Sequence, residues 1–218
     1  RIRKVAARIA RHVAAGDRLV VTVSAMGRET DRLVGMARDL AGRPDRRELD
    51  ALMATGEQRS TALMCLALQA LDVPARSLTG AQAGFRVSDL YGEARILEVD
   101  PARVRAELEE RPVVVVAGFQ GLASNGDVAT LGRGGSDTTA VALAAALGAD
   151  ACEIFTDTDG VYTTDPHLVP PATRLREIDY DEMLELAQLG AQVLHPRAVW
   201  YARRYGVRIH VRSSFSFA

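Results

Sequence analysis

The sequence lacks the features of several classes of protein. It has only two cysteines, Cys65 and Cys152, each within an apolar stretch, which excludes a disulfide scaffold and a C-x-x-C metal site. Basic and acidic residues nearly balance, 27 against 28, so no overall field attracts nucleic acid or an anionic membrane. No apolar run approaches the roughly 18 residues of a membrane span, and the basic first residues lead into an amphipathic pattern, not a signal peptide. We therefore expect a cytoplasmic protein that binds neither nucleic acid nor membranes, and that meets any anionic ligand with local charge.

The sequence contains instead an alternation of helical and strand-like segments over 218 residues, a length that fits one domain with two lobes. In helical segments apolar residues recur at spacings of three and four, as Ile2, Val5, Ile9 and Val13 do before Gly16. Strand-like segments are near-continuous apolar runs, which indicates burial on both faces. The predicted strands are 18–25, 112–118, 151–156 and 207–213. The predicted helices are 2–13, 29–40, 47–71, 101–110 with Asp100 as its cap, 136–149, 180–190 and 196–206.

This alternation predicts an α/β fold. Strands that follow one another through helices form right-handed crossovers, which give a mostly parallel sheet covered by helices on both faces. In such sheets ligands bind at the carboxyl ends of the strands.

A glycine-rich stretch, 130-TLGRGGSDTTAVALAAALGA-149, lies where such a ligand site is expected. It places 132-GRGGSD-137 just before a predicted helix that starts at about Ser136. Backbone N–H groups, the helix dipole and the Arg133 charge together favour a phosphate there. The alternative is that Ser136 or Asp137 only caps the helix after a flexible loop. The pattern matches neither the P-loop nor the dinucleotide-binding glycine motif.

Six segments together carry a family resemblance. They are 22-TVSAMGRETD-31, 55-TGEQRS-60, 117-AGFQG-121, 130-TLGRGGSDTTA-140, 156-TDTDGVYTTDP-166 and 190-GAQVLHPRA-198. In order and approximate spacing the chain resembles the catalytic domain of the aspartate kinases, in the amino acid kinase family. The resemblance covers essentially all 218 residues, and the TLGRGGSD and TDTDGVYTTDP blocks together are highly specific.

The resemblance implies a three-layer αβα sandwich with a mostly parallel central sheet. An amino acid lobe would occupy about residues 1–117 and a nucleotide lobe about 118–218. The implied activity is transfer of the ATP γ-phosphoryl to the β-carboxylate of L-aspartate, the first step towards lysine, threonine and methionine. Phosphoryl transfer needs positioning and charge neutralisation more than a protein nucleophile, and no Ser-His-Asp pattern is evident.

The resemblance also assigns an amino acid site. Arg133 would bind the α-carboxylate of aspartate with its guanidinium fork, and Glu57 the α-ammonium. Asp137 would in addition orient groups near the transferred phosphoryl, so that Arg133, Ser136 and Asp137 are the candidate catalytic residues. Taken alone, Glu57 would be a solvated helix residue and Phe119 a core residue. The remaining pocket residues would be Ser24, Thr30, Phe119, Ser136 and Asp137.

A nucleotide site is implied for the second half of the chain. Thr156 and Asp157 end a predicted strand, and Mg²⁺ would be held mainly by the ATP phosphates and water, with no protein metal site. Alone, 156-TDTDGVYTTDP-166 would be an Asx-turn loop. His167 and Gln192 stand where many relatives have cations, which predicts weaker ATP binding, and His167 with His195 does not make a metal site. The nucleotide-site residues would be Thr156, Asp157, Tyr162, Asp165, His167 and Gln192.

The resemblance further implies segments outside the sequence given. The first helix opens without a cap, and the family begins with a strand and a K-[FY]-G-G-T-S loop, so we expect the chain to extend upstream. After 211-VRSSFSFA-218 the family continues into regulatory domains, and the full protein would be a homo-oligomer. Two alternatives stay open. One is a kinase of glutamate or acetylglutamate, although Arg133 with Glu57, which would bind a free α-amino acid, argues against the acetylated substrate. The other is a non-catalytic ligand-binding module, which would be expected to lose Asp137 or Arg133.

Overall fold

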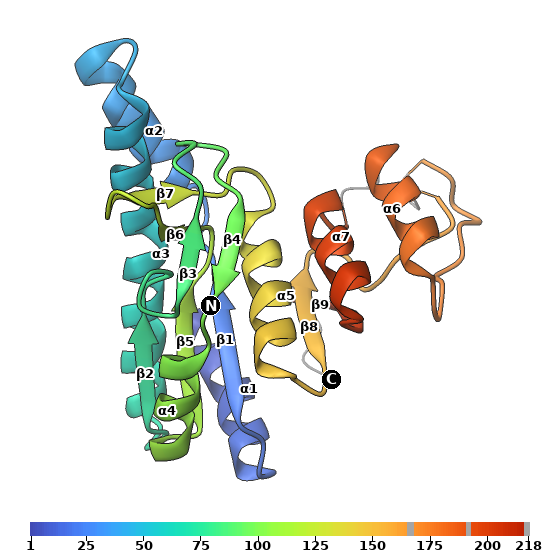
Figure 1. Ribbon diagram of the computed structural model, residues 1–218. Helices are drawn as coiled ribbons and strands as arrows, with labels where there is room; N and C mark the ends of the chain where they lie inside the picture. The colour runs from blue at the N-terminus through green and yellow to red at the C-terminus, as the bar shows by residue number, and fades with distance from the viewer. Residues whose placement is uncertain (165–167, 191–192, 216–218) are drawn as a thin grey trace. The chain divides into compact units, whose positions relative to one another are not determined.

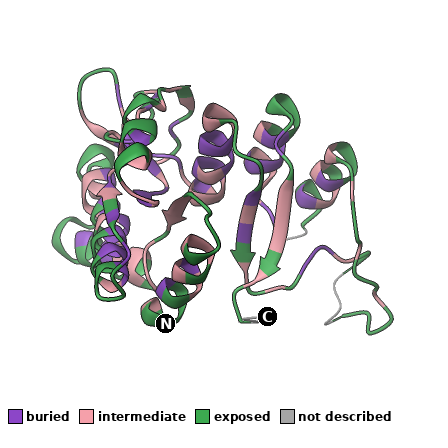
Figure 2. Ribbon diagram, turned by 90° about the horizontal axis from the view of Figure 1, so that it is seen from below, coloured by how far each residue is buried: buried purple, intermediate pink, exposed green. Residues whose placement is uncertain are grey.

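The computed structural model in Figure 1 describes residues 1–164, 168–190 and 193–215. The chain forms two compact units, Arg1–Thr139 and Ala140–Ala218. Figure 2 shows that helices in both units bury one face and expose the other, as amphipathic sequences do. No helix among the described residues is both long enough and apolar enough to cross a membrane.

A parallel sheet forms the centre of the first unit. Among the described residues, β5 (Val113–Ala117) lies between β1 (Leu19–Val23) and β2 (Ala75–Leu78), and both pairings are parallel. The branched residues of β5 are buried throughout, which confirms that strand as predicted. The prediction of two buried faces is wrong for β1, whose five residues are all partly exposed, because β1 lies at an edge of this sheet.

The helices of the first unit form where the apolar spacing predicted them. They are α1 (Ile2–Ala14), α2 (Glu29–Ala41), α3 (Arg46–Gln69) and α4 (Ala102–Glu110). One core cluster joins α1, α3 and β5 through residues such as Ile9, Leu68 and Val115. Asp100 is not the N-cap of α4 as predicted, because Pro101 occupies that position. The Asp100 carboxylate instead accepts a hydrogen bond of 3.0 Å from the N–H of Ala102, the residue that follows Pro101.

A second sheet in this unit was not predicted. Its strand order is β4 (Ile96–Val99), β3 (Phe85–Val87), β6 (Gln120–Leu122) and β7 (Val128–Thr130), with parallel pairing only between β3 and β6. Asp50 of α3, buried to 1% exposure, ties this sheet to the helix. Its carboxylate accepts hydrogen bonds from Gly92 N–H at 2.8 Å, from Thr130 N–H at 2.7 Å and from the Thr130 hydroxyl at 2.9 Å. With three donors, this buried carboxylate is fully satisfied.

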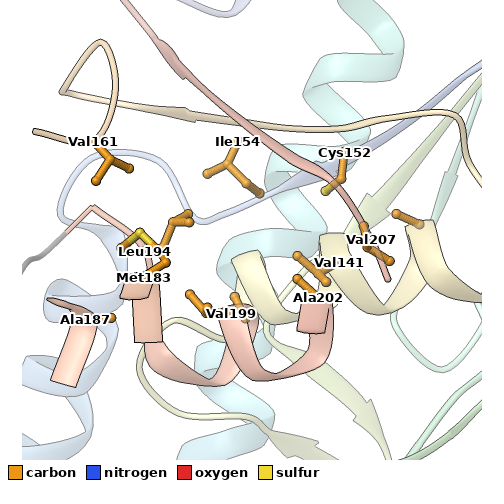
Figure 3. Packing of buried hydrophobic residues seen from close by; sticks show 12 residues of the cluster. Val141, Cys152, Ile154, Val161, Met183, Ala187, Leu194, Val199, Ala202 and Val207 are labelled. Atoms are coloured by element: carbon orange, nitrogen blue, oxygen red, sulfur yellow. The ribbon is translucent and has the colours of Figure 1, made fainter. Parts of the chain in front are cut away.

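The second unit contains a parallel pair of strands, β8 (Cys152–Thr156) and β9 (Ile209–Ser213), and two helices, α6 (Tyr180–Gln188) and α7 (Pro196–Tyr205). Figure 3 shows its core, in which Ile154 of β8, Met183 of α6 and Val199 of α7 belong to one buried cluster. Burial on both faces is again wrong for β8 and β9, which keep partly exposed residues.

Local signals explain where α7 starts and stops. Pro196 is its first residue, the His195 ring Nδ1 accepts a hydrogen bond from Arg197 N–H at 3.3 Å, and Gly206 ends it in the left-handed conformation at φ 67°. His195 therefore serves as a helix cap. The remaining helix, α5 (Gly135–Leu147), begins in the first unit and continues into the second.

Candidate active site

The chain turns sharply where β5 ends. Phe119 has φ 70°, a left-handed conformation that costs a residue with a side chain about 1–3 kcal/mol. Its main chain is held on both sides, because its N–H donates to Thr139 Oγ1 at 3.1 Å and its carbonyl accepts from Leu131 N–H at 2.8 Å. Such strain persists only where the surroundings fix it, which is typical of functional sites.

The glycine-rich loop brings the start of α5 against this turn. A Cβ added to Gly135 would lie 2.8 Å from Phe119 Cδ2, and one added to Gly118 would lie 2.8 Å from Ser136 Oγ. Only glycine permits both approaches. Phe119 and Ser136 are therefore neighbours, and the predicted placement of the loop at a helix N-terminus is confirmed, with the helix starting at Gly135.

The side chains of the loop and first turn are available to a ligand. In the part of the chain that the structure describes, Ser136, Asp137 and Arg133 have no side-chain hydrogen-bond or ion-pair partner, so the capping alternative is not realised. Hydroxyls of Thr138 and Thr139 bond instead to the carbonyls of the loop. The Asp137 carboxyl is partly shielded from solvent, and this burial raises its pKa. Arg133, in contrast, is exposed to solvent.

Glu57 lies on α3 beside the end of β1. Its side chain is only 3% exposed, which contradicts the alternative of a solvated helix residue. Glu57 Oε1 accepts a hydrogen bond from Ala25 N–H at 2.9 Å, and Oε2 is buried without a partner among the described residues. Burial raises the pKa of this carboxyl, since its charged form loses water. Gly56 permits the contact, because an added Cβ would lie 2.9 Å from Ala25 Cβ.

The ends of β1 and β5 connect these groups. Val23 pairs with Ala117 in the parallel ladder, and Gly118 N–H donates to the Val23 carbonyl at 3.0 Å. Ser24, which is exposed, follows Val23 directly and precedes Ala25. Contacts therefore run without a break from Glu57 through the β1 end to Phe119 and Ser136.

Thr30 lies in the first turn of α2, next to a charged group that sequence reasoning missed. Glu29 accepts hydrogen bonds from Arg32 at 2.7 and 3.0 Å and pairs with Arg59 of α3 at 2.9 Å. The Arg32 hydrogen bond, more than any other contact, lowers the pKa of Glu29 to about 2. The pair with Arg59 joins α2 to the helix that carries Glu57. Acidic residues in the first turn of a predicted helix were the signal that could have indicated it.

In the second unit, the predicted nucleotide residues follow β8. Thr156 Oγ1 donates to Asp157 Oδ1 at 3.0 Å, and the Thr156 carbonyl accepts from Ser214 N–H at 2.7 Å. The Tyr162 hydroxyl donates to Asp159 Oδ1 at 2.9 Å, and this hydrogen bond to a carboxylate raises the tyrosine pKa.

Arg174 contacts the loop that follows β8, a contact that the sequence did not predict. It pairs with Asp159 at 3.4 Å and forms an antiparallel bridge with Tyr162. Asp165, His167 and Gln192 lie outside the described residues. Within the described ranges, no three His, Cys, Asp or Glu side chains cluster as a metal site would require.

Comparison with known proteins decides the family. The model of the amino acid kinase family matches residues 1–213. The chain belongs to this family. The predicted fold class, the three-layer αβα sandwich with a mostly parallel central sheet, is thereby confirmed, and solved members agree with it. The chain is 58% identical to an aspartate kinase from Synechocystis, with a TM-score of 0.87 over 99% of this chain and 36% of that one.

Two further relatives are aspartokinases. The chain is 59% identical to an aspartokinase of Thermus thermophilus, covering 100% of this chain and 54% of the relative. It is 36% identical to E. coli aspartokinase III, solved with aspartate and ADP, with a TM-score of 0.74 over 85% of this chain and 43% of that one. A uridylate kinase from Archaeoglobus fulgidus, 20% identical with a TM-score of 0.66 over 98% of this chain and 83% of that one, shares the fold alone. The chain spans about half the length of the curated relatives it matches.

Proposed function

We propose that this chain is the catalytic part of an aspartate kinase, which transfers the γ-phosphoryl of ATP to the β-carboxylate of L-aspartate. The observation that carries the proposal is the buried, unpartnered Oε2 of Glu57. Aspartokinases more than 50% identical to this chain support it, as does E. coli aspartokinase III, solved with aspartate and ADP.

Among the described residues, no cation pairs with the Glu57 carboxylate. A buried carboxylate with an unsatisfied oxygen is costly, and its raised pKa expresses that cost. The α-ammonium of an amino acid would supply both a charge and a hydrogen bond to Oε2. An acetylated amino group would supply no charge, so Glu57 favours a free amino acid over acetylglutamate.

Arg133 would bind the α-carboxylate of the same amino acid, next to the ammonium that Glu57 would bind. Its guanidinium is exposed and without a partner among the described residues, and its planar fork matches a carboxylate. Ser24, Thr30, Phe119, Ser136 and Asp137 would complete the pocket.

The reaction requires no nucleophile from the protein. An oxygen of the aspartate β-carboxylate would attack the γ-phosphorus, the bond from that phosphorus to the bridging oxygen would break, and ADP would leave with its electron pair. The N–H groups at the start of α5, together with Arg133, would stabilise negative charge on the transferred group, and Asp137 would orient its neighbours.

The nucleotide would be bound by Thr156, Asp157, Tyr162, Asp165, His167 and Gln192. Mg²⁺ would be held mainly by the ATP phosphates and water, and would neutralise charge on them. We place the amino acid lobe at about residues 1–117 and the nucleotide lobe at about 118–218. The full protein would be a cytoplasmic homo-oligomer with further regulatory domains, in keeping with relatives about twice as long.

The test is an assay of ATP-dependent hydroxamate formation by the full protein with aspartate, glutamate and N-acetylglutamate. Of these three acceptors, we expect only aspartate to be turned over. Turnover with N-acetylglutamate would contradict the proposal that Glu57 binds a free α-ammonium. Turnover with glutamate would contradict the proposal that aspartate is the substrate. Binding of aspartate and ATP without turnover would identify a ligand-binding module instead.

A further inference from the structure

Thr139 connects the two sides of the proposed amino acid pocket. It lies on α5, one turn after the residues of the glycine-rich loop, and its side chain is 0% exposed. Its Oγ1 donates to the Gly135 carbonyl at 2.8 Å and accepts from Phe119 N–H at 3.1 Å. A hydroxyl has one donor and two acceptor positions, so a single atom serves both bonds.

The two bonds hold the main chain of Phe119 and the first turn of α5. Phe119 has φ 70°, a strained conformation, and the bond from its N–H to Thr139 is one of the two hydrogen bonds that hold its main chain there. The Gly135 carbonyl lies at the start of the helix turn that carries Ser136 and Asp137. A Cβ added to Gly135 would lie 2.8 Å from Phe119 Cδ2 and 3.1 Å from Phe119 Cα, so Phe119 lies close against this turn.

The preceding residue lacks this connection. Thr138 is also buried, at 3% exposure, and its Oγ1 donates to the Gly134 carbonyl at 2.9 Å. It has no hydrogen bond to β5 or to the turn that follows it in the described structure. Two neighbouring threonines thus make the same bond within the helix, and only Thr139 also makes the bond to Phe119.

We propose that Thr139 is a positioning residue, whose hydroxyl holds the strained Phe119 turn against the first turn of α5 and so sets the spacing across the amino acid pocket. The inference rests on the proposed function, because Phe119, Ser136 and Asp137 bind substrate only if the pocket takes an amino acid. It adds to that function a residue that touches no substrate.

The experiment compares Thr139→Val, Thr139→Ser and Thr138→Val in the full protein. Thr139→Val keeps the shape and removes both bonds, Thr139→Ser keeps the hydroxyl, and Thr138→Val removes only a bond within the helix. We expect kcat/KM for aspartate to fall about 10- to 100-fold in Thr139→Val, because small displacements of reacting groups are costly. KM for MgATP should stay within about twofold, and the other two variants within about threefold of wild type.

Hydrogen exchange of the Phe119 amide gives a second readout that does not depend on activity. Exchange should become at least about tenfold faster in Thr139→Val and stay unchanged in Thr139→Ser and Thr138→Val, because only the first loses the acceptor. If Thr139→Val does not fold, Thr139→Cys replaces it. A thiol accepts hydrogen bonds weakly, so the same changes are expected at smaller size.

Equal losses in Thr139→Val and Thr138→Val, or unchanged Phe119 exchange in Thr139→Val, would overturn the inference. A loss shared equally between aspartate and MgATP would show a general packing role and would overturn it too. If wild type has no aspartate kinase activity but Phe119 exchange still responds only to Thr139→Val, the proposed function fails while the structural bond stands.

Discussion

The amino acid side of the proposed site, in Arg1–Thr139, is held in place by buried groups such as Glu57 and Thr139, whereas the described residues of the nucleotide side, in Ala140–Ala218, are held by exposed pairs. Glu57 is 3% exposed and Thr139 0%, and Phe119 is held in a strained conformation. The side chains of Arg174 and Asp159, which hold the second region, are 58% and 51% exposed. Exposed ion pairs contribute only about 0–1 kcal/mol to the free energy of unfolding. The first region is therefore the more tightly held of the two, and substitutions there should have the larger effects.

The largest expected effect is on the proposed carboxylate-binding residue. Arg133→Lys keeps the charge and loses the bidentate fork, so we expect a loss of about 2–3 kcal/mol in kcat/KM for aspartate. Steady-state kinetics of the full protein measure it, with KM for MgATP as the control. Near-wild-type kcat/KM would show that Arg133 does not bind the α-carboxylate.

A matched pair of glycine substitutions compares the two regions directly. Gly118→Ala places a methyl group 2.8 Å from Ser136 Oγ and 3.0 Å from Ser136 Cα, against the main chain of a helix. Gly160→Ala meets only the flexible Arg174 side chain, at 2.8 Å from Cδ. We expect Gly118→Ala to lower the free energy of unfolding by about 1–3 kcal/mol, and Gly160→Ala by less than about 0.5 kcal/mol.

Denaturant unfolding of the two glycine variants measures the difference. Equal destabilisation would mean that the two regions are packed with the same rigidity, and the comparison would fail.

The next effect tests the buried carboxyl. Glu57→Gln removes the charge that would bind the α-ammonium, so KM for aspartate should rise about tenfold at neutral pH, with little change in KM for MgATP. Equal effects on the two KM values would indicate a packing role for Glu57. In wild type, KM for aspartate should also rise as the pH falls through the pKa of Glu57, which burial raises above its ordinary value of 4.5.

Stability should show the opposite pH dependence. Because the folded protein has the higher pKa, it favours the protonated Glu57 carboxyl, and the stability so gained is lost as the pH rises through the raised pKa. Glu57→Gln cannot ionise and escapes this loss, so its stability relative to wild type should increase from about pH 4.5 upwards. Burial also raises the pKa of Asp137, but that group titrates in both proteins, so the difference isolates Glu57. A difference in stability that is constant with pH would contradict the prediction.

The smallest effect concerns the nucleotide side. The family resemblance implies that Gln192 replaces a cation beside the nucleotide phosphates, and we propose on that basis that Gln192→Lys and Gln192→Arg tighten MgATP binding by about 1 kcal/mol, or about fivefold. Calorimetry at low and high ionic strength measures this, and the gain should fade as salt rises. Unchanged affinity at low salt would place residue 192 away from the phosphates.

Much of the fold was predictable because its signals are local. Apolar spacing and a following glycine located α1 and α7 to within about two residues, and the valine run located β5. The four-stranded sheet was missed because its strands have three or four residues and include exposed charged ones such as Arg86 and Glu98. Such strands are stabilised by partners distant in the sequence, as when Arg86 pairs with Leu122, and a local pattern does not record that pairing.

The candidate site divides in the same way. The sequence by itself determined that a glycine-rich, cationic loop precedes a helix, and its motifs indicated the family. Only the tertiary structure decided that Glu57 is buried with an unpartnered oxygen, that Phe119 is strained, and that Thr139 and not Thr138 holds it. The physical reason is that burial and hydrogen-bond partners depend on which distant segments meet, here the ends of β1 and β5 with α3 and α5, whereas helix starts depend on a few neighbouring residues.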